Sequence, residues 1–343
     1  MNLLIIQTAF IGDVVLATPL LQAAREQLGA TYVAAVVRPD AGGLLHHHPA
    51  VDEIIPFDKK GSDRGLKGLI RLRGRLRAKH FEVALIPHRS LRSALLARLS
   101  RIPVRIGFDT SAGRWLLTHR VPYQTIHEVE RNLRLLSPLT SAPLSSKPKL
   151  YPDDTDYAAA DDLLKRHDVR PDETLFGISP GSVWATKRWL PDRFAESAKR
   201  LTDEHTGRVV LFGGADDEAL CRQIAEQSGV SPINAAGQLS LLQSAALASR
   251  CAVMISNDTG MAHIAAAMDT PVIALFGPTV ASLGFTPYGD RHQIIEQSLS
   301  CRPCGTHGGP QCPIATHACM QEITVNIVME TISTMIQTLN PEP

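Results

Sequence analysis

The sequence lacks any apolar run long enough to cross a membrane. A transmembrane helix needs about 20 consecutive, mostly apolar residues, and polar residues break every apolar stretch of this chain before that length. In the apolar N-terminal stretch, residues 1–21, the run is interrupted by Gln7, Asp13 and Pro19, and no basic leader precedes it. A strand, a short loop and a helix from about Asp13 fit it better than a signal peptide. We therefore expect a cytoplasmic protein.

Aromatic residues are also scarce, at 5% of the chain, and the formal net charge is only +1. Scarce aromatics argue against nucleic-acid binding by base stacking. The fingerprint G-x-G-x-x-G is absent, which argues against a nicotinamide-dependent dehydrogenase. What is present, 44% hydrophobic and 20% charged residues in a chain of 343, is typical of a globular protein with one or, more often, two domains.

The small net charge hides a strong asymmetry. Between Lys59 and Arg120 there are sixteen Lys or Arg and only three acids, so this stretch carries +13 and the rest of the chain carries −12. A single basic residue here is explained equally well by a solvated helix face. The cluster as a whole indicates an anionic partner, and both nucleic acid and a phosphorylated lipid headgroup fit that description.

Short apolar segments alternate with helical stretches along the whole chain. The segments are rich in β-branched residues and do not alternate with polar ones, as in strands buried on both faces. Helices between such strands imply right-handed parallel crossovers, so the fold class is α/β with two doubly wound sheets and ligands at the carboxyl ends of the strands. The expected strands are 3–7, 32–37, 53–57, 83–87 and 104–107, then 174–179, 208–212, 253–256 and 271–276.

A stretch rich in Ser and Pro, residues 137–156, has no helical period and suits a linker. We therefore expect an N-terminal domain over residues 1–155 and a C-terminal domain over 156–322. A last helix within 323–343 is expected to pack back on the N-terminal domain.

Polar loops follow two strands of the second domain. After 174–179 come Ser182, Lys187 and Arg188, and cations beside hydroxyls at a strand end suit a diphosphate, although a solvent-facing basic pair is the plainer explanation. After 208–212 come Asp217 and Glu218, which suit ribose hydroxyls but are also favoured simply as acids in a first helical turn.

A third loop follows strand 253–256 and opens a helix. Its amides and the helix dipole form an anion site near Gly260, to which Thr259 adds a hydroxyl donor. Asp258 would repel phosphate, so it orients the loop or a sugar hydroxyl. His263 lies one turn further on, where it either faces the same ligand or is structural.

In the first domain, the loop Thr8 to Asp13 follows the first strand and opens the first helix. Asp13 is either a helix-capping carboxylate or a base at the strand ends, where these folds carry out their chemistry.

Six cysteines divide into two groups. Cys221 and Cys251 look like single core residues, whereas Cys301, Cys304, Cys312 and Cys319 form a cluster. Cytoplasmic proteins rarely depend on disulfides. A structural zinc ion fits the C-x2-C start, but the later spacings are looser than in zinc ribbons, so we do not expect a metal there, nor at residues 46–49 (HHHP).

Several motifs together resemble the ADP-heptose–lipopolysaccharide heptosyltransferases, most closely the heptosyltransferase II type. They are FIGDVVLATPLLQAAR (10–25), HPAVDEIIPFDK (48–59), SPGSVWATKRWLP (179–191), SNDTGMAHIAAA (256–267), FGPT (276–279) and CRPCGTHGGPQCPIATHACM (301–320). The resemblance implies a GT-B fold, with two Rossmann-like domains facing across a cleft, and an inverting, metal-independent glycosyltransferase that needs no cofactor. The donor would be ADP-heptose, bound by the second domain.

The resemblance also assigns residue roles. Asp13 would be the general base, with Thr8 and Gly12 beside the substrates. The donor diphosphate would contact Ser182, Lys187, Thr259 and Gly260, with Lys187 stabilising the departing ADP. Heptose would contact Asp258 and His263, and adenosine would contact Asp217, Glu218 and Leu239.

The implied acceptor explains the basic first domain. It is the anionic heptosyl-Kdo-lipid A of the lipopolysaccharide inner core, reached by peripheral contact with the cytoplasmic membrane of a Gram-negative bacterium, so no nucleic-acid partner is expected. Candidates to hold it are Lys59, Lys60, Arg64, Arg89, Arg92, Arg101 and Arg105. Alternatives are a glycosyltransferase with another nucleotide-sugar donor, or a non-catalytic protein that binds nucleotide sugars or polyanions.

Overall fold

The computed structural model describes residues 1–143 and 145–339. The chain divides into two compact units, Met1–Tyr151 and Pro152–Pro343, so the division falls a few residues before the expected domain limit at 155. The first helix of the second unit, α7 (Asp154–Arg166), begins just after this division because Asp153 caps it: its carboxylate accepts hydrogen bonds from the amides of Thr155 and Asp156.

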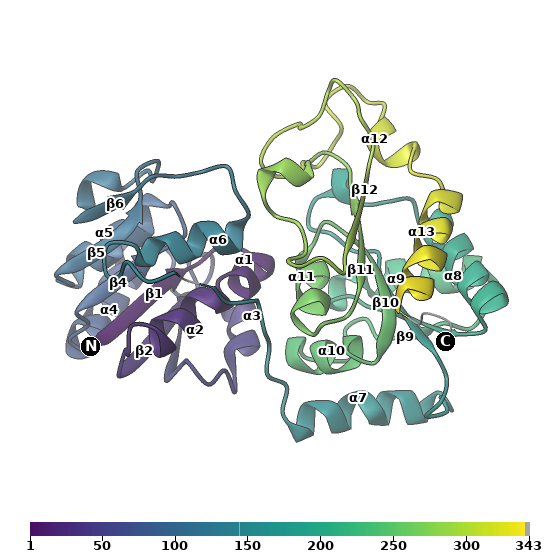
Figure 1. Ribbon diagram of the computed structural model, residues 1–343, viewed down its shortest axis with the longest axis horizontal. Helices are drawn as coiled ribbons and strands as arrows, with labels where there is room; N and C mark the ends of the chain where they lie inside the picture. The colour runs from purple at the N-terminus through teal and green to yellow at the C-terminus, as the bar shows by residue number, and fades with distance from the viewer. Residues whose placement is uncertain (144, 340–343) are drawn as a thin grey trace. The chain divides into compact units, whose positions relative to one another are not determined.

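The first unit contains a parallel sheet of six strands in the order β3-β2-β1-β4-β5-β6 (Figure 1). The strands are β1 (Asn2–Gln7), β2 (Tyr32–Val37), β3 (Glu53–Pro56), β4 (Val83–Ile86), β5 (Val104–Phe108) and β6 (His119–Val121). The helices are α1 (Ile11–Leu16), α2 (Thr18–Glu26), α3 (Pro39–Gly42), α4 (Gly65–Ala78), α5 (Leu91–Leu99) and α6 (Glu128–Leu133), with 3-10 turns η1 (Gly43–Leu45), η2 (Arg114–Leu116) and η3 (Arg134–Leu136).

The second unit repeats this plan with the order β12-β11-β10-β7-β8-β9, again all parallel. Its strands are β7 (Leu175–Ser179), β8 (Arg208–Leu211), β9 (Ile233–Asn234), β10 (Cys251–Asn257), β11 (Val272–Phe276) and β12 (Gln293–Glu296). Its helices are α7, α8 (Pro191–His205), α9 (Glu218–Ser228), α10 (Leu241–Ala248), α11 (Gly260–Ala267), α12 (Ala318–Gln321) and α13 (Val325–Leu339), with 3-10 turns η4 (Ala185–Lys187), η5 (Ala215–Asp217) and η6 (Ala281–Leu283).

The strand order reverses once in each sheet, and this fixes where a ligand can bind. In the first unit the chain builds outward in one direction from β1 and in the other from β4; in the second unit it does so from β7 and β10. At such a switch point the loops leave the carboxyl ends of the two central strands in opposite directions and open a crevice. The expected α/β fold class with two doubly wound sheets is confirmed.

Three strands were not expected from the sequence: β6, β9 and β12. Each lies at the edge of its sheet. All three are short and partly exposed, so they lack the continuous apolar run that marks the central strands; β12, for example, buries only Ile295. The fourth edge strand, β3, was expected, at residues 53–57.

The last helix, α13, uses its apolar face inside the second unit. Val328, Met329 and Ile332 on this helix are buried in the core that lies on the α8 side of the sheet. The chain leading into it is fixed by Trp189, whose buried indole donates to the carbonyl oxygen of Ile323 at 3.0 Å. The apolar face of α13 is thus buried within its own unit, and a contact of this helix with the N-terminal domain stays a prediction.

Candidate functional site

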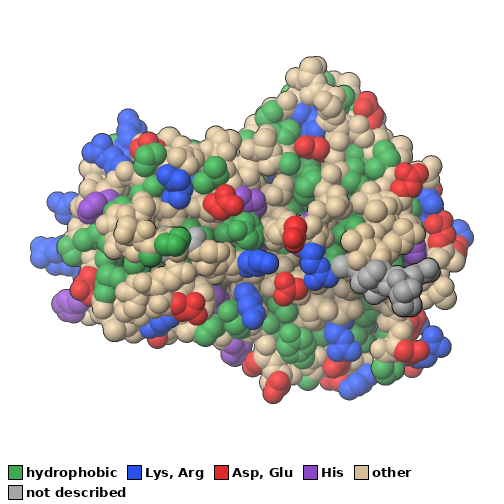
Figure 2. Space-filling model, in the orientation of Figure 1, with side chains coloured by type: hydrophobic (Ala, Val, Ile, Leu, Met, Phe, Trp, Pro, Cys, Tyr) green, Lys and Arg blue, Asp and Glu red, His purple; other side chains and the backbone are tan. Residues whose placement is uncertain are grey.

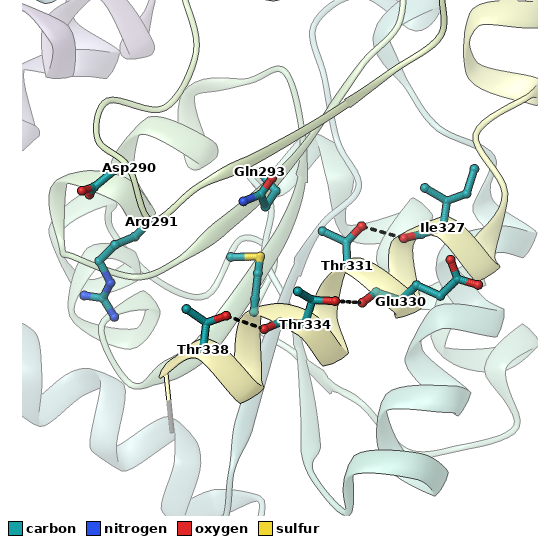
Figure 3. A pocket seen from close by; sticks show the side chains of 9 residues that line it. Asp290, Arg291, Gln293, Ile327, Glu330, Thr331, Thr334 and Thr338 are labelled. Carbon is teal, nitrogen blue, oxygen red and sulfur yellow. Dashed lines mark hydrogen bonds between the residues drawn. The ribbon is translucent and has the colours of Figure 1, made fainter. Parts of the chain in front are cut away.

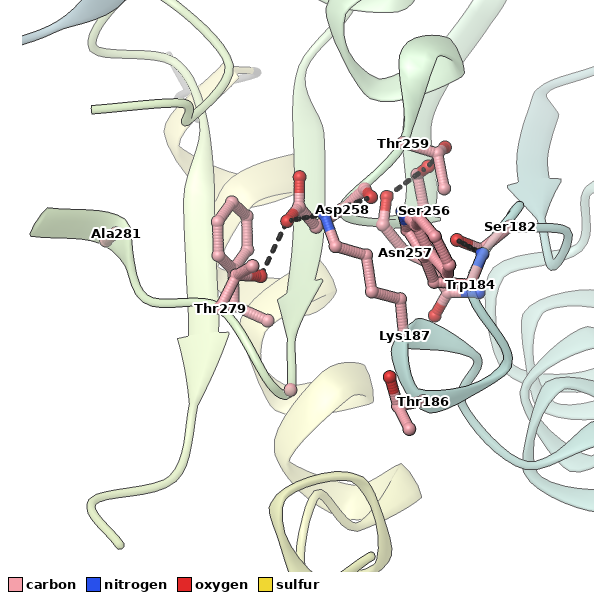
Figure 4. A network of polar contacts seen from close by, with 12 residues as sticks. Ser182, Trp184, Thr186, Lys187, Ser256, Asn257, Asp258, Thr259, Thr279 and Ala281 are labelled. Atoms are coloured by element: carbon pink, nitrogen blue, oxygen red, sulfur yellow. Dashed lines mark hydrogen bonds and ion pairs between the residues drawn. The ribbon is translucent and has the colours of Figure 1, made fainter. Parts of the chain in front are cut away.

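The loops after β7 and β10 meet at the switch point of the second sheet. Lys187 follows β7 and Asp258 follows β10, and their Nζ and Oδ2 atoms lie 2.5 Å apart (Figure 4). Both side chains are largely buried, with 12% and 8% exposed. The hydroxyl of Thr279, which follows β11, donates to the same carboxylate oxygen at 2.6 Å. Three strand-end loops are therefore tied together through one carboxylate.

Asn257 fixes the backbone of these loops. Its side chain is fully buried, accepts a hydrogen bond from the amide of Trp189 at 3.0 Å and donates to the carbonyl oxygen of Pro180 at 2.8 Å. The sequence did not predict a role for Asn257, although this residue directly precedes Asp258 in the loop after β10. Its buried amide holds the chain on both sides of Lys187 and so limits where Lys187 can lie.

The N-terminus of α11 lies beside this network. Thr259 is the N-cap, in extended conformation, but its side chain makes no capping hydrogen bond to α11; its hydroxyl lies 3.3 Å from that of Ser256. The first amides of α11, from Gly260 onward, therefore receive no side-chain cap from Thr259 and can serve an anion. His263 follows on the same helix and is buried.

Ser182 and Arg188 stabilise the loop that carries Lys187. The Ser182 hydroxyl accepts from the amide of Trp184 at 3.4 Å (Figure 4). The Arg188 guanidinium donates to the carbonyl oxygen of Ser182 at 2.9 and 2.7 Å. Arg188 is thus engaged with its own loop, whereas Lys187 reaches the Asp258 carboxylate after β10.

The three residues expected at adenosine have other contacts. The Asp217 carboxylate accepts from the amide of Gly214 at 3.1 Å. It also lies so close to Gly181 that a Cβ added there would meet it at 2.4 Å. Glu218 forms an exposed ion pair with Arg222 at 2.6 Å, and Leu239 packs partly buried against the core. These contacts fit the structural explanations, and adenosine binding at these residues stays a prediction.

At the switch point of the first sheet, Thr8 after β1 meets His88 after β4. The Thr8 hydroxyl lies 3.0 Å from Nδ1 of His88, and Lys59 donates to the carbonyl oxygen of Thr8 at 2.5 Å. Burial first, and then the charges of Lys59 and Arg89, lower the pKa of His88 to about 4. His88 is therefore a neutral imidazole at physiological pH. Sequence reasoning missed it because one histidine after a strand carries no pattern of its own.

Asp13 caps its own helix. It is the third residue of α1, next to the buried Gly12, and its Oδ2 accepts a hydrogen bond from the amide of Phe10 at 3.0 Å. Burial lowers the pKa of Lys59 and the negative charge of Asp13 opposes that shift, whereas the same charge contributes to the raised pKa of Glu128. Burial raises the pKa of Glu128 to about 7, and the charge of Asp13 adds to this rise while Arg131 opposes it.

The candidate acceptor cations differ in what they contact. The Arg105 guanidinium donates to the carbonyl oxygens of Ile102, Pro103 and Leu116, which leaves it little capacity for an anion. Arg89 lies 4.2 Å above the Tyr123 ring. Lys59 is half-buried. The remaining four candidates are exposed: Lys60, Arg64, Arg92 and Arg101.

The cysteines of residues 301–319 do not form a preformed metal site. Within the described residues, no three of these thiols come within 4.8 Å of one another. Cys304, Cys312 and Cys319 line a small pocket of about 80 Å³ together with Thr186 and His317. Cys221 and Cys251 are buried, and burial raises the pKa of each thiol to about 12, as suits core residues.

A wider pocket of about 580 Å³ lies between α13 and the loop before β12 (Figure 3). The hydroxyls of Thr331, Thr334 and Thr338 line it, but each donates to a carbonyl of its own helix. The pocket contains none of the predicted site residues. Among the described residues, no helix has the length and apolarity needed to cross a bilayer.

Comparison with known proteins shows the family to which the chain belongs. The sequence pattern of glycosyltransferase family 9 (heptosyltransferase) matches residues 69–312. The chain is 30% identical to lipopolysaccharide heptosyltransferase 2 of Salmonella typhimurium, over 84% of this chain and 85% of that one. It is 26% identical to lipopolysaccharide heptosyltransferase 1 of Pseudomonas aeruginosa, over 89% and 86%. The solved structure of E. coli ADP-heptose lipopolysaccharide heptosyltransferase II matches with a TM-score of 0.78 and 25% identity, covering 98% of this chain and 99% of that one.

The environment of His88 predicts a pH dependence of stability. Because the pKa of His88 is lower in the folded protein than its usual value near 6.5, its contribution to stability is complete above about pH 6.5 and is lost as the pH falls toward 4, by up to about 3 kcal/mol. His88→Gln removes this titration. The difference in urea unfolding free energy between wild type and His88→Gln should therefore depend on pH between 4.5 and 7.5. The exposed His46→Gln is the control, and equal pH slopes for all three proteins would contradict the prediction.

Proposed function

The chain belongs to glycosyltransferase family 9, the heptosyltransferases, and from that premise we propose that it transfers heptose from ADP-heptose to heptosyl-Kdo-lipid A with inversion. The observation that carries the proposal is the Lys187–Asp258 pair beside the N-terminus of α11, at the switch point of the second sheet. A cation and a row of helix amides at one strand-end crevice suit a diphosphate. The proposed donor is the one in the name of a relative of solved structure, the E. coli ADP-heptose lipopolysaccharide heptosyltransferase II.

The donor diphosphate is assigned to Lys187, Thr259 and Gly260, with Ser182 at the edge. In the absence of donor, Asp258 balances the charge of Lys187. When the diphosphate binds, Lys187 gains a second anionic partner, and Asp258 keeps the ammonium oriented while it accepts from heptose hydroxyls. His263, further along α11, is assigned to the heptose.

The reaction is a single displacement. The acceptor hydroxyl oxygen attacks the anomeric carbon of ADP-heptose, its proton passes to the Asp13 carboxylate, and the bond from the anomeric carbon to the phosphate oxygen breaks with both electrons leaving on ADP. Lys187 and the amides of α11 stabilise the charge that develops on ADP. These protein groups do the work that a divalent cation does in other transferases, so the proposal requires no metal or other cofactor.

Asp13 fits the role of base because its capping bond fixes it. The amide of Phe10 binds Oδ2, which holds the carboxylate in one orientation at the carboxyl end of β1. Thr8, whose backbone binds Lys59, and Gly12 lie in the same turn, next to the acceptor hydroxyl. Lys59 and Arg89, near His88, are the cations of this site that would meet the anionic inner core.

The proposed activity is tested by transfer from ADP-heptose to lipid A cores that carry no, one or two heptoses. We expect turnover with the one-heptose core, because the relative with 30% identity is a heptosyltransferase 2. Preference for the heptose-free core would assign the chain to the type 1 reaction, whose relative is 26% identical. UDP- and GDP-hexoses serve as donor controls, and faster transfer from either of them would overturn the proposed donor.

Asp13→Asn separates the two roles of this residue. The Asn side-chain oxygen can still accept the capping bond from Phe10, but the amide cannot take a proton. We expect turnover to fall about 10²- to 10⁴-fold, the usual contribution of a general base, with little change in ADP affinity measured by calorimetry. Turnover close to that of wild type would leave Asp13 only its capping role.

We also propose peripheral contact with the cytoplasmic face of the membrane, through an exposed apolar and basic surface of the first unit. Four large apolar side chains are exposed on the adjoining elements α4, α5 and η2: Leu66, Ile70, Leu91 and Trp115, at 66%, 48%, 43% and 62%. Exposed cations lie among them, Lys67, Arg71, Arg92 and Arg114. Figure 2 shows Lys and Arg side chains gathered at the left edge of this unit. Apolar residues among cations are typical of proteins that bind anionic bilayers.

Removing apolar side chains from this surface should weaken membrane binding. Each large apolar group that enters the bilayer contributes roughly 1.5–3 kcal/mol, so Trp115→Ser is expected to reduce binding to vesicles with anionic lipid about tenfold. Transfer to a delipidated acceptor should be unaffected. Ile327→Ser on α13, also exposed, is the matched control. Equal vesicle binding by wild type and Trp115→Ser would place the contact elsewhere.

A further inference from the structure

The segment of residues 301–319, which carries four cysteines, has no task in the proposed mechanism. We call it the cysteine segment. It follows β12 and contains little regular structure before α12. Yet its backbone and side chains contact two of the loops that hold the Lys187–Asp258 pair, and these contacts point to a function.

Its first contact is made by Arg302. Only 4% of this side chain is exposed. The guanidinium donates to the carbonyl oxygens of Thr279 at 2.6 Å and Phe276 at 3.1 Å, and the next cysteine, Cys304, donates its amide to Pro278 at 2.8 Å. Arg302 thereby fixes the loop after β11, whose Thr279 hydroxyl binds the Asp258 carboxylate.

Its second contact is with Thr186, the residue before Lys187. The amide and hydroxyl of Thr186 donate to the carbonyl oxygen of Gly309 at 3.1 and 3.0 Å, and the Gly309 amide donates to the Thr186 hydroxyl at 2.8 Å. Nε2 of His317 donates to the Thr186 carbonyl oxygen at 2.9 Å. Thr186 is buried. Its amide, its carbonyl oxygen and its hydroxyl all form hydrogen bonds with the cysteine segment.

Gly308 brings the cysteine segment into direct contact with Lys187. A Cβ added at Gly308 would lie 2.8 Å from Cβ of Trp184 and 3.0 Å from both Cγ of Lys187 and Oγ1 of Thr186. A real Cβ does not tolerate the shortest of these distances, so the loop would have to move. A Cβ added at the neighbouring Gly309 would meet only the carbonyl oxygen of Gln311, at 3.6 Å.

We propose that the cysteine segment is a clamp that positions Lys187 for the donor diphosphate, through Thr186 on one side and through Thr279 and Asp258 on the other. The inference rests on the proposed donor role of Lys187. A free lysine side chain has many rotamers, and a side chain held in its working geometry before binding does not lose that rotamer entropy when the ligand binds. Arg302, Gly308 and His317 are positioning residues in this scheme and touch no substrate, whereas Gly309 contributes only backbone groups, which an added methyl group leaves in place.

A purely structural role is the competing explanation. Cys319 and Met320 are buried in the core of the second unit, so changes nearby can destabilise the fold. A loss of folded protein lowers turnover in proportion to the active fraction, but it leaves the dissociation constant for ADP unchanged. ADP affinity, measured by calorimetry on full-length protein, therefore separates positioning from folding.

The first experiment compares Gly308→Ala with Gly309→Ala. Both changes add one methyl group to the same segment and restrict the unfolded chain equally. We expect Gly308→Ala to weaken ADP binding about tenfold and to lower turnover by up to about 10²-fold, the scale of a 1 Å misplacement, and Gly309→Ala to change ADP affinity less than twofold. The KM for the acceptor should not change. Equal ADP affinities in the two variants would overturn the clamp.

The second experiment repeats Gly308→Ala in a Lys187→Ala background. Lys187→Ala alone should weaken ADP binding about tenfold or more, as expected for a charge-assisted contact. If the clamp acts through Lys187, adding Gly308→Ala should then change ADP affinity less than twofold. A full additional loss would overturn the clamp. Unchanged ADP affinity in Lys187→Ala alone would instead overturn the proposed donor role, so the two failures are distinguishable.

A third pair of variants covers misfolding of the glycine variants. Thr186→Val removes the hydroxyl that binds Gly309 and keeps the shape, whereas Thr186→Ser restores the hydroxyl. We expect Thr186→Val to weaken ADP binding severalfold and Thr186→Ser to recover most of it, with thermal unfolding recorded for each. Equal ADP affinity in the Val and Ser variants would contradict a positioning role for Thr186.

Discussion

The ion pair between Lys187 and Asp258 is the interaction on which the proposed donor site depends. Removing two charges from water costs more than their attraction returns unless hydrogen bonds complete the geometry, and here they do: Thr279 donates to Asp258, and Asn257 and Thr186 fix the backbone on either side. The pair therefore requires loops from three strands to lie in fixed positions. The pair provides a cation that is already desolvated and oriented at the strand ends, next to helix amides that also favour an anion.

The sequence predicts the central strands well, but it misses three of the four edge strands. Central strands such as β2 are buried on both faces, so they read as unbroken apolar runs, whereas β6, β9 and β12 are partly exposed and leave no such record. At the site, Lys187, Asp258 and Thr259 could be predicted because strand-end loops carry chemistry. Thr186, Asn257 and Arg302 could not, since their importance comes from partners distant in the chain, which a single sequence does not reveal.

The capping role of Asp13 leaves its proposed role as the base intact. The sequence posed these as alternatives, and the structure establishes the cap through Phe10. A carboxylate anchored by one oxygen is restricted in rotation, which is a useful property in a base. The nearby neutral His88 and buried Glu128 add a second lesson, because their altered pKa values come from burial. Burial is a property of the folded chain, so no local sequence motif predicts these altered pKa values.

Each unit has its own sheet and its own buried core. Substitutions that retune the basic loops after β1, β3 and β4 therefore need not disturb the network around Lys187, and the reverse also holds. Under the proposed division of roles, the first unit can evolve toward new sugar acceptors with little constraint from the second unit, which binds the activated sugar. An architecture of this kind allows gene duplication to yield a series of enzymes that extend one glycan stepwise from a shared building block.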